Sequence, residues 1–202
     1  MKYGYIIIMI LMTSIFLVGC QDKDYFISNQ YPNPGVIYDE DLRFPVSAIK
    51  VTGSSNLPSF GSFIGKTQIL YFSPSSIEQA FVTAQFPHAK IDNSTIMPHF
   101  HWTFVDEQAS GDVVWCMEYT CANIDFIFPL TNISCVIDTA QAPLQHHITD
   151  MIHIKNTFNL SAMCAIRIFR NATNPLDTFN ADAGLLEYDI HYLNIFYGRR
   201  VS

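Results

Sequence analysis

The sequence predicts an all-β protein, a β-sandwich of the jelly-roll kind, behind an N-terminal signal or anchor segment. Apolar and polar residues alternate along several short segments, as a strand with one buried face requires. Glycine and proline recur at short spacings between residues 44 and 74 and interrupt any helical period. Apolar residues make up 49% of the chain and aromatic residues 14%, while only 14% are charged, which favours a packed β domain over a disordered chain.

Two segments show the alternation most clearly. From Asp112 to Thr120 every second residue, including Trp115, is large and apolar, so these side chains are expected to share the core face of one strand. From Leu185 to Leu193 the same period places Leu186, Tyr188, Ile190 and Tyr192 on one face. Further strands are predicted at 68–72, 81–86, 97–105 and 162–170. Many short strands without a long amphipathic helix are typical of a sandwich or barrel.

The first twenty residues predict a membrane-targeting segment. Lys2 precedes an apolar run that ends in Leu17-Val18-Gly19-Cys20, and charged residues begin at Asp22. This is the pattern of a secretory signal, and its ending resembles a bacterial lipobox, in which Cys20 is acylated after cleavage. An uncleaved anchor and a mistaken start codon are the alternatives. We predict a signal or membrane anchor at 1–20, a tether or extended arm at 21–41 and a β-sandwich domain at 42–202.

The remaining cysteines are Cys116, Cys121, Cys135 and Cys164. Export permits disulfides, and four cysteines allow three pairings, which the sequence does not distinguish. Small apolar core residues are the alternative interpretation. No Cys-x-x-Cys pair is present, which argues against a structural zinc site of that kind. The net charge of -7, without a run of lysine or arginine, argues against nucleic-acid binding.

The candidate site is a set of histidines. His99 and His101 are two residues apart, so in a strand both point to the face opposite Phe100. Together with Glu118 and His191 they make a conceivable metal set that resembles the cupin arrangement of His-x-His, a glutamate and a distant histidine. The glutamate spacing and flanking glycines of cupins are missing, so we expect a polar cluster without a tightly bound catalytic metal and without a cofactor. Hydrogen-bonded histidines at a sheet face and a pH-sensitive interface are the other interpretations.

A second polar group lies near the end of a predicted strand. Arg167 and Arg170 flank two apolar residues, and Asp177 follows an Asn-Pro turn. We interpret these residues as an ion-pair system that anchors a loop.

Several ordered motifs resemble a family of tailed-phage and prophage structural proteins. The motifs are Gln85-Phe86-Pro87-His88, Pro98-His99-Phe100-His101-Trp102, Gly111-Asp112-Val113-Val114-Trp115 with Glu118-Tyr119, Arg167-Ile168-Phe169-Arg170, and Asp189-Ile190-His191-Tyr192. The similarity spans about residues 38 to 198. It implies a β-sandwich structural domain that is virion-associated and oligomeric, without established catalysis. The lipoprotein-like leader departs from that family and suggests display on a bacterial surface.

The sequence therefore favours a non-enzymatic, phage-type structural or surface-attachment module that forms a homo-oligomer. Its expected partners are virion or cell-surface components and, through the N-terminal segment, a membrane. Its expected location is exported and membrane-anchored, or virion-associated. A metal-dependent cupin-like enzyme and a ligand-binding outer-membrane lipoprotein are the alternatives.

Overall fold

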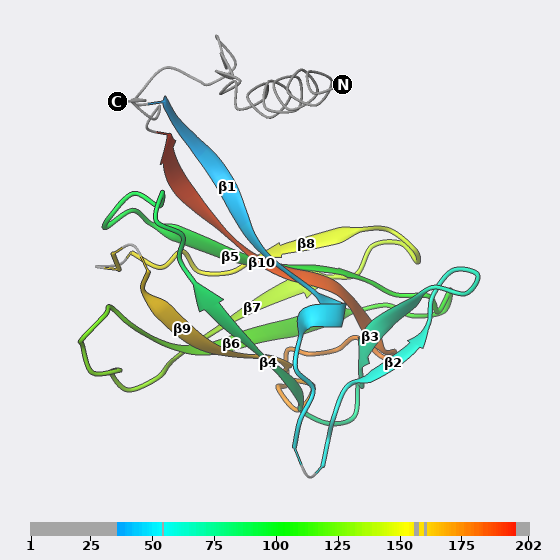
Figure 1. The fold of residues 1–202 in the computed structure, drawn as a ribbon. Helices are drawn as coiled ribbons and strands as arrows, with labels where there is room; N and C mark the ends of the chain where they lie inside the picture. The colour runs from blue at the N-terminus through cyan, green and yellow to red at the C-terminus, as the bar shows by residue number, and fades with distance from the viewer. Residues whose placement is uncertain (1–35, 54, 156–157, 160, 197–202) are drawn as a thin grey trace, which may run out of the picture. The chain divides into compact units, whose positions relative to one another are not determined.

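The computed structural model describes residues 36–196 apart from residues 54, 156–157 and 160 (Figure 1). The predicted signal segment with Cys20 and most of the predicted arm lie outside these residues. The strands are β1 (Val36–Pro45), β2 (Ser59–Ser62), β3 (Gln68–Phe72), β4 (Glu78–Gln85), β5 (Ile96–Thr103), β6 (Asp112–Ala122), β7 (Asn132–Thr139), β8 (His147–Asp150), β9 (Met163–Arg170) and β10 (Ala183–Phe196). A single turn of 3-10 helix, η1 (Val46–Ala48), follows β1. In the part of the chain that the structure describes, no helix is long and apolar enough to cross a membrane.

The strands form two antiparallel sheets with the strand order of a jelly roll. The large sheet has the order β2-β3-β10-β5-β8, and the small sheet has the order β4-β9-β6-β7. The pairs β3·β10, β4·β9, β5·β8 and β6·β7 are therefore nested within one another, as in a long hairpin rolled into two sheets. This confirms the predicted all-β, jelly-roll-like sandwich.

Strand β1 pairs along its own whole length with one edge of β10. The pairing runs in register from Val36 opposite Phe196 to Pro45 opposite Glu187, while β3 occupies the same edge of β10 only at residues 183–185. Residues 36–41, predicted as part of the arm, thus belong to the large sheet.

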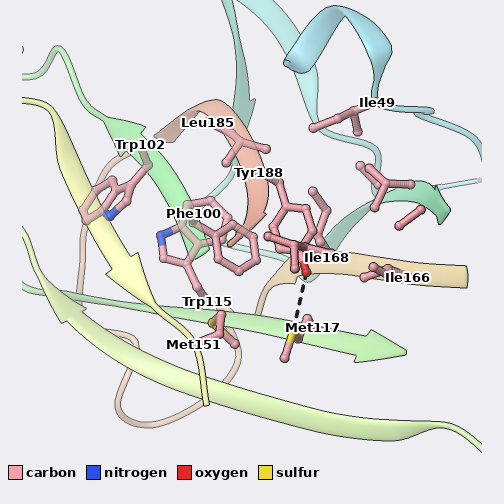
Figure 2. Close-up of a cluster of buried hydrophobic side chains, with 14 of the residues drawn as sticks. Ile49, Phe100, Trp102, Trp115, Met117, Met151, Ile166, Ile168, Leu185 and Tyr188 are labelled. Carbon is pink, nitrogen blue, oxygen red and sulfur yellow. Dashed lines mark hydrogen bonds between the residues drawn. The ribbon is translucent and has the colours of Figure 1, made fainter. Parts of the chain in front are cut away.

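The two inner faces meet in an aromatic core (Figure 2). Phe100 of β5 stacks on Trp115 of β6 with ring centroids 4.9 Å apart, and Tyr188 of β10 lies edge-on to Phe100 at 5.2 Å. The Tyr188 hydroxyl donates a hydrogen bond to the sulfur of Met117 across the interface. Trp115 is fully buried and Glu118 faces away from it, so the predicted register of β6 is confirmed.

Two disulfides, one on each face of the small sheet, resolve the cysteine pairing. Cys116 of β6 is bonded to Cys135 of β7 on the outer face, and Cys121 of β6 to Cys164 of β9 on the core face. Both bridges join residues that lie directly opposite each other in antiparallel pairs.

The predicted loop anchor is present at the end of β9 for Arg170 and Asp177, whereas Arg167 pairs with Glu118 on the outer face of the small sheet. Arg170 and Asp177 form a two-point ion pair, and both side chains are completely buried. Asp177 also accepts a hydrogen bond from the Val114 backbone, which fixes the loop between β9 and β10 against β6.

Candidate functional site

Three of the four candidate residues meet on the outer face of the large sheet. His99 and His101 lie on β5 and His191 on β10, and these two strands are neighbours. Because Phe100 fills the core from β5, its histidine neighbours point outward. Asp189 of β10 lies directly opposite His99 in the pairing and joins the same group.

The carboxylate of Asp189 is the centre of this histidine cluster. Its Oδ1 lies 2.6 Å from Nε2 of His99, and its Oδ2 lies 3.2 Å from Nε2 of His101. The ring of His191 meets that of His99 edge-on, with centroids 4.2 Å apart. Nε2 of His191 lies 2.9 Å from Oδ1 of Asp41 on β1. The cluster therefore spans three adjacent strands.

The close contacts in this cluster shift the pKa values of Asp189 and His99. Burial alone would raise the pKa of Asp189, but the hydrogen bonds and charges of His101 and His99 lower it to about 2. Burial disfavours protonation of His99, yet the close negative charge of Asp189 outweighs burial and raises the pKa of that imidazole. Asp189 is thus ionised throughout the neutral range.

Two further residues belong to the cluster although the sequence did not point to them. Asp41 lies on β1, where an extended arm was expected, and His146 lies on the loop before β8, with Nε2 2.7 Å from Nδ1 of His101. Burial and the neighbouring charges of His101 and His147 lower the pKa of His146. A shallow pocket opens beside Asp189, between His146 and the ion pair of Arg43 with Glu187.

Glu118 does not join the histidines. It lies on the outer face of the small sheet, where its carboxylate pairs with Arg167 at 2.6 Å and accepts a hydrogen bond from Thr131. The cupin-like set of His99, His101, Glu118 and His191 is therefore not assembled. The two sheets place the glutamate and the histidines on opposite outer surfaces.

A second surface, which sequence reasoning missed, is the loop between β6 and β7. Its large apolar side chains are exposed: Ile127 by 93%, Leu130 by 92% and Phe126 by 71%, with Ile124 and Phe128 beside them. The run Ile124 to Leu130 contains one charge, Asp125, and its apolar residues follow no strand period that would bury them. We call this segment, residues 124–130, the apolar loop.

The apolar loop is held by specific hydrogen bonds. The hydroxyl of Thr120 donates to the carbonyl of Pro129, and the backbone of Phe126 donates to that of Asn123. The side chain of Asn123 accepts a hydrogen bond from the backbone of Asn159 in the next loop. These contacts close the loop at its base and leave its apolar side chains outside.

The apolar loop lies at the end of the sandwich where β1 begins (Figure 1). β1 begins opposite the last residue of β10, and β10 ends beside the start of β5. In the small sheet, Ala122 at the end of β6 lies opposite Met163, which in turn lies opposite the end of β4. Backbone bonds from residues 86–90 reach both Ala162 and Ile195, so these strand ends form one end of the sandwich, which we call the tether end.

Comparisons with known proteins give remote structural neighbours. No family model and no curated protein matches the sequence. The solved structure of TmCBM61 in complex with beta-1,4-galactotriose is 14% identical with a TM-score of 0.31 and covers 84% of this chain and 99% of its own. A structure of infectious bursal disease virus Gx strain is 11% identical (TM-score 0.30; 86% and 54% covered). The non-crystalline cellulose specific carbohydrate-binding module CBM28 is 10% identical (TM-score 0.29; 77% and 89% covered). Similarity this distant transfers no ligand to this chain.

Proposed function

We propose that the protein is a non-enzymatic structural or surface-attachment module of the tailed-phage type, tied to a membrane through Cys20. In this proposal the apolar loop is a second contact with the same bilayer. The observation that carries it is the position of the loop: five exposed large apolar residues lie at the tether end of the sandwich.

The exposure of the loop supports a partner that is itself apolar. Transferring apolar surface out of water is favourable by roughly 25 cal/mol per Å², so side chains such as Ile127 and Leu130 gain most from a hydrocarbon-like surrounding. Contiguous exposed apolar residues mark protein or membrane contacts. Here the only charge within the loop is Asp125, so binding to uncharged lipid is expected to suffice.

The geometry of the tether supports the bilayer as that partner. Fifteen residues separate Cys20 from the start of β1, a reach of at most about 50 Å when fully extended. A lipid on Cys20 therefore keeps the tether end near the membrane.

The test uses the full chain bound to neutral phosphatidylcholine vesicles, with a protease site introduced between residues 24 and 35. After cleavage, the wild-type sandwich should stay with the vesicles on sedimentation. A Phe126→Ser/Ile127→Ser variant should be released, with partitioning at least about tenfold lower. The matched control is Leu176→Ser, an exposed apolar residue of the loop between β9 and β10, at the opposite end of the sandwich. Release of the wild-type sandwich to the same extent as the loop variant would exclude the membrane contact.

The resemblance to phage structural proteins also supports assembly into a homo-oligomer. The mass of the released sandwich, measured by light scattering, tests this part separately. A mass of several chains is expected, and a single-chain mass would overturn it. If the loop variant changes the mass but not vesicle binding, the loop is a contact between copies and the membrane proposal fails.

A further inference from the structure

The histidine cluster also has the composition and arrangement of a metal site. His99, Asp189 and His191 each offer one donor atom, and these three atoms lie within 4.8 Å of one another. Zinc binds imidazole nitrogen and carboxylate oxygen at about 2.0–2.2 Å, so its ligands stand roughly 3–4 Å apart. Small side-chain rotations bring the three donors to that spacing.

The contact between His99 and Asp189 has the form of two ligands around one ion. Asp189 Oδ1 lies 2.6 Å from Nε2 of His99, yet it has no hydrogen bond of acceptable geometry within the described residues. The two atoms are therefore close while the N–H direction of the ring misses the oxygen. Two ligands of one metal ion have this geometry, because the lone pair of each points at the ion and not at the other ligand. The side chains of His99 and Asp189 are both only 4% exposed.

Each of the three side chains also has a second polar partner that fixes its orientation. Metal-binding histidines usually donate their second ring nitrogen to a carboxylate or carbonyl. His99 hydrogen-bonds the backbone of Met97, and Nε2 of His191 faces Asp41 Oδ1 at 2.9 Å. Asp189 Oδ2 pairs with His101. The sequence had indicated a cluster without a tightly bound catalytic metal because the glutamate spacing and flanking glycines of cupins are missing. The fold supplies a different carboxylate, Asp189, together with the orienting groups.

We propose that His99 Nε2, His191 Nδ1 and one carboxylate oxygen of Asp189 bind a divalent transition-metal ion, and that zinc fits the set best. Two imidazoles and one carboxylate are the borderline donors that Zn²⁺ accepts, whereas Mg²⁺ and Ca²⁺ take oxygen ligands. The ion would join β5 to β10 on the outer face of the large sheet. This site is independent of the membrane contact proposed above, because it lies on other elements.

The test titrates Zn²⁺ and Co²⁺ into the full chain in detergent, without a polyhistidine tag and with Cys20→Ser in every sample, so that no free thiol competes. We expect about one ion per chain, the visible absorption of tetrahedral Co²⁺, and a rise in the midpoint of thermal unfolding. His191→Gln changes a partly exposed ligand, and Asp41→Asn removes only its orienting partner; each should lower the affinity at least about tenfold. The matched control His153→Gln, an exposed histidine outside the cluster, should bind like the parent chain.

The thermal unfolding of the metal-free samples shows whether each variant is folded, so a lost affinity cannot be mistaken for lost structure. An absence of binding in the parent chain would overturn the proposal. Equal affinity in the parent chain, His191→Gln and Asp41→Asn would also overturn it, since the ion would then bind elsewhere.

Discussion

Arg170 and Arg43 show that burial decides how much an arginine ion pair contributes to the stability of the fold. Arg170 is completely buried and pairs with Asp177, while its guanidinium also donates to the carbonyls of Phe72, Ala181 and Phe179. Arg43 makes an equally close two-point contact with Glu187, but its side chain is 66% exposed. Water competes for the second pair and cannot reach the first.

We predict that Arg170→Met destabilises the domain by about 3–5 kcal/mol, because it leaves Asp177 charged, buried and without its partner. Arg43→Met should cause only a small fraction of that loss. Urea unfolding followed by tryptophan fluorescence measures both free energies. Equal losses in the two variants would show that burial is not what makes the Arg170 pair important.

The sequence predicted some of the individual residues of the histidine cluster. Parity along a strand placed His99 and His101 on one face, and the structure agrees because β5 pairs without a shift opposite residues 187–192 of β10. A bulge between Leu185 and Glu187 shifts the alternation, so Leu185 and not the predicted Leu186 lies in the core. Asp41 and His146 were not predicted, since each lies in a polar run, Asp39-Glu40-Asp41 and Gln145-His146-His147, that does not alternate. Which strands lie side by side is a long-range property, and it alone brings Asp189 rather than Glu118 to the histidines.

Strand β6 is the element around which the sandwich packs. Trp115 on its core face contacts Phe72, Phe100 and Trp102 from the opposite sheet. Its indole N–H is buried and finds no acceptor within the described residues. The indole therefore stabilises the core through its apolar area and its stacking rather than through a hydrogen bond.

Trp115→Ala should accordingly cost roughly 3–5 kcal/mol, whereas Trp115→Phe, which keeps an aromatic ring and removes only the unsatisfied N–H and one ring, should cost about 1–2 kcal/mol. Denaturant unfolding of both variants gives the comparison. A loss below about 1 kcal/mol for the alanine variant would contradict the burial of this side chain.

Strands with a buried apolar face were predictable, edge strand β4 among them, whereas the edge strands β1, β2, β7 and β8 were not. The alternation of β6 and β10 reflects their position inside the sandwich, where one face meets the other sheet. Edge strand β7 also alternates, but it directs Ile133 and Ile137 toward solvent, so its pattern gives no core signal. Strand β1 carries Asp39, Glu40 and Asp41 in a row and is held in place by its backbone pairing with β10.

The whole molecule has two ends of different character because a jelly roll returns alternate strands to the same end. β1 enters where β10 leaves, and the loop after β6 lies there as well. The described core is built from residues that follow β1, beginning at Ile49.

A shortened chain beginning at Asp24 should thus be soluble and unfold in one cooperative transition, with the same urea midpoint as the full chain in detergent. We expect folding without the leader, because the shortened chain keeps the whole described pairing of β1 with β10 and the described core. Circular dichroism and tryptophan fluorescence should give coincident transitions, which is the mark of two-state unfolding.

A chain beginning at Val46 is the matched comparison. It lacks β1, so the edge of β10 from Glu187 to Phe196 loses its backbone partners, and the contacts of Leu42 and Phe44 with the core are removed. Its midpoint should be clearly lower, and the newly exposed edge should promote association between chains. If instead the chain beginning at Asp24 precipitates while the full chain folds, the leader is part of the folded unit, because no other difference separates the two proteins.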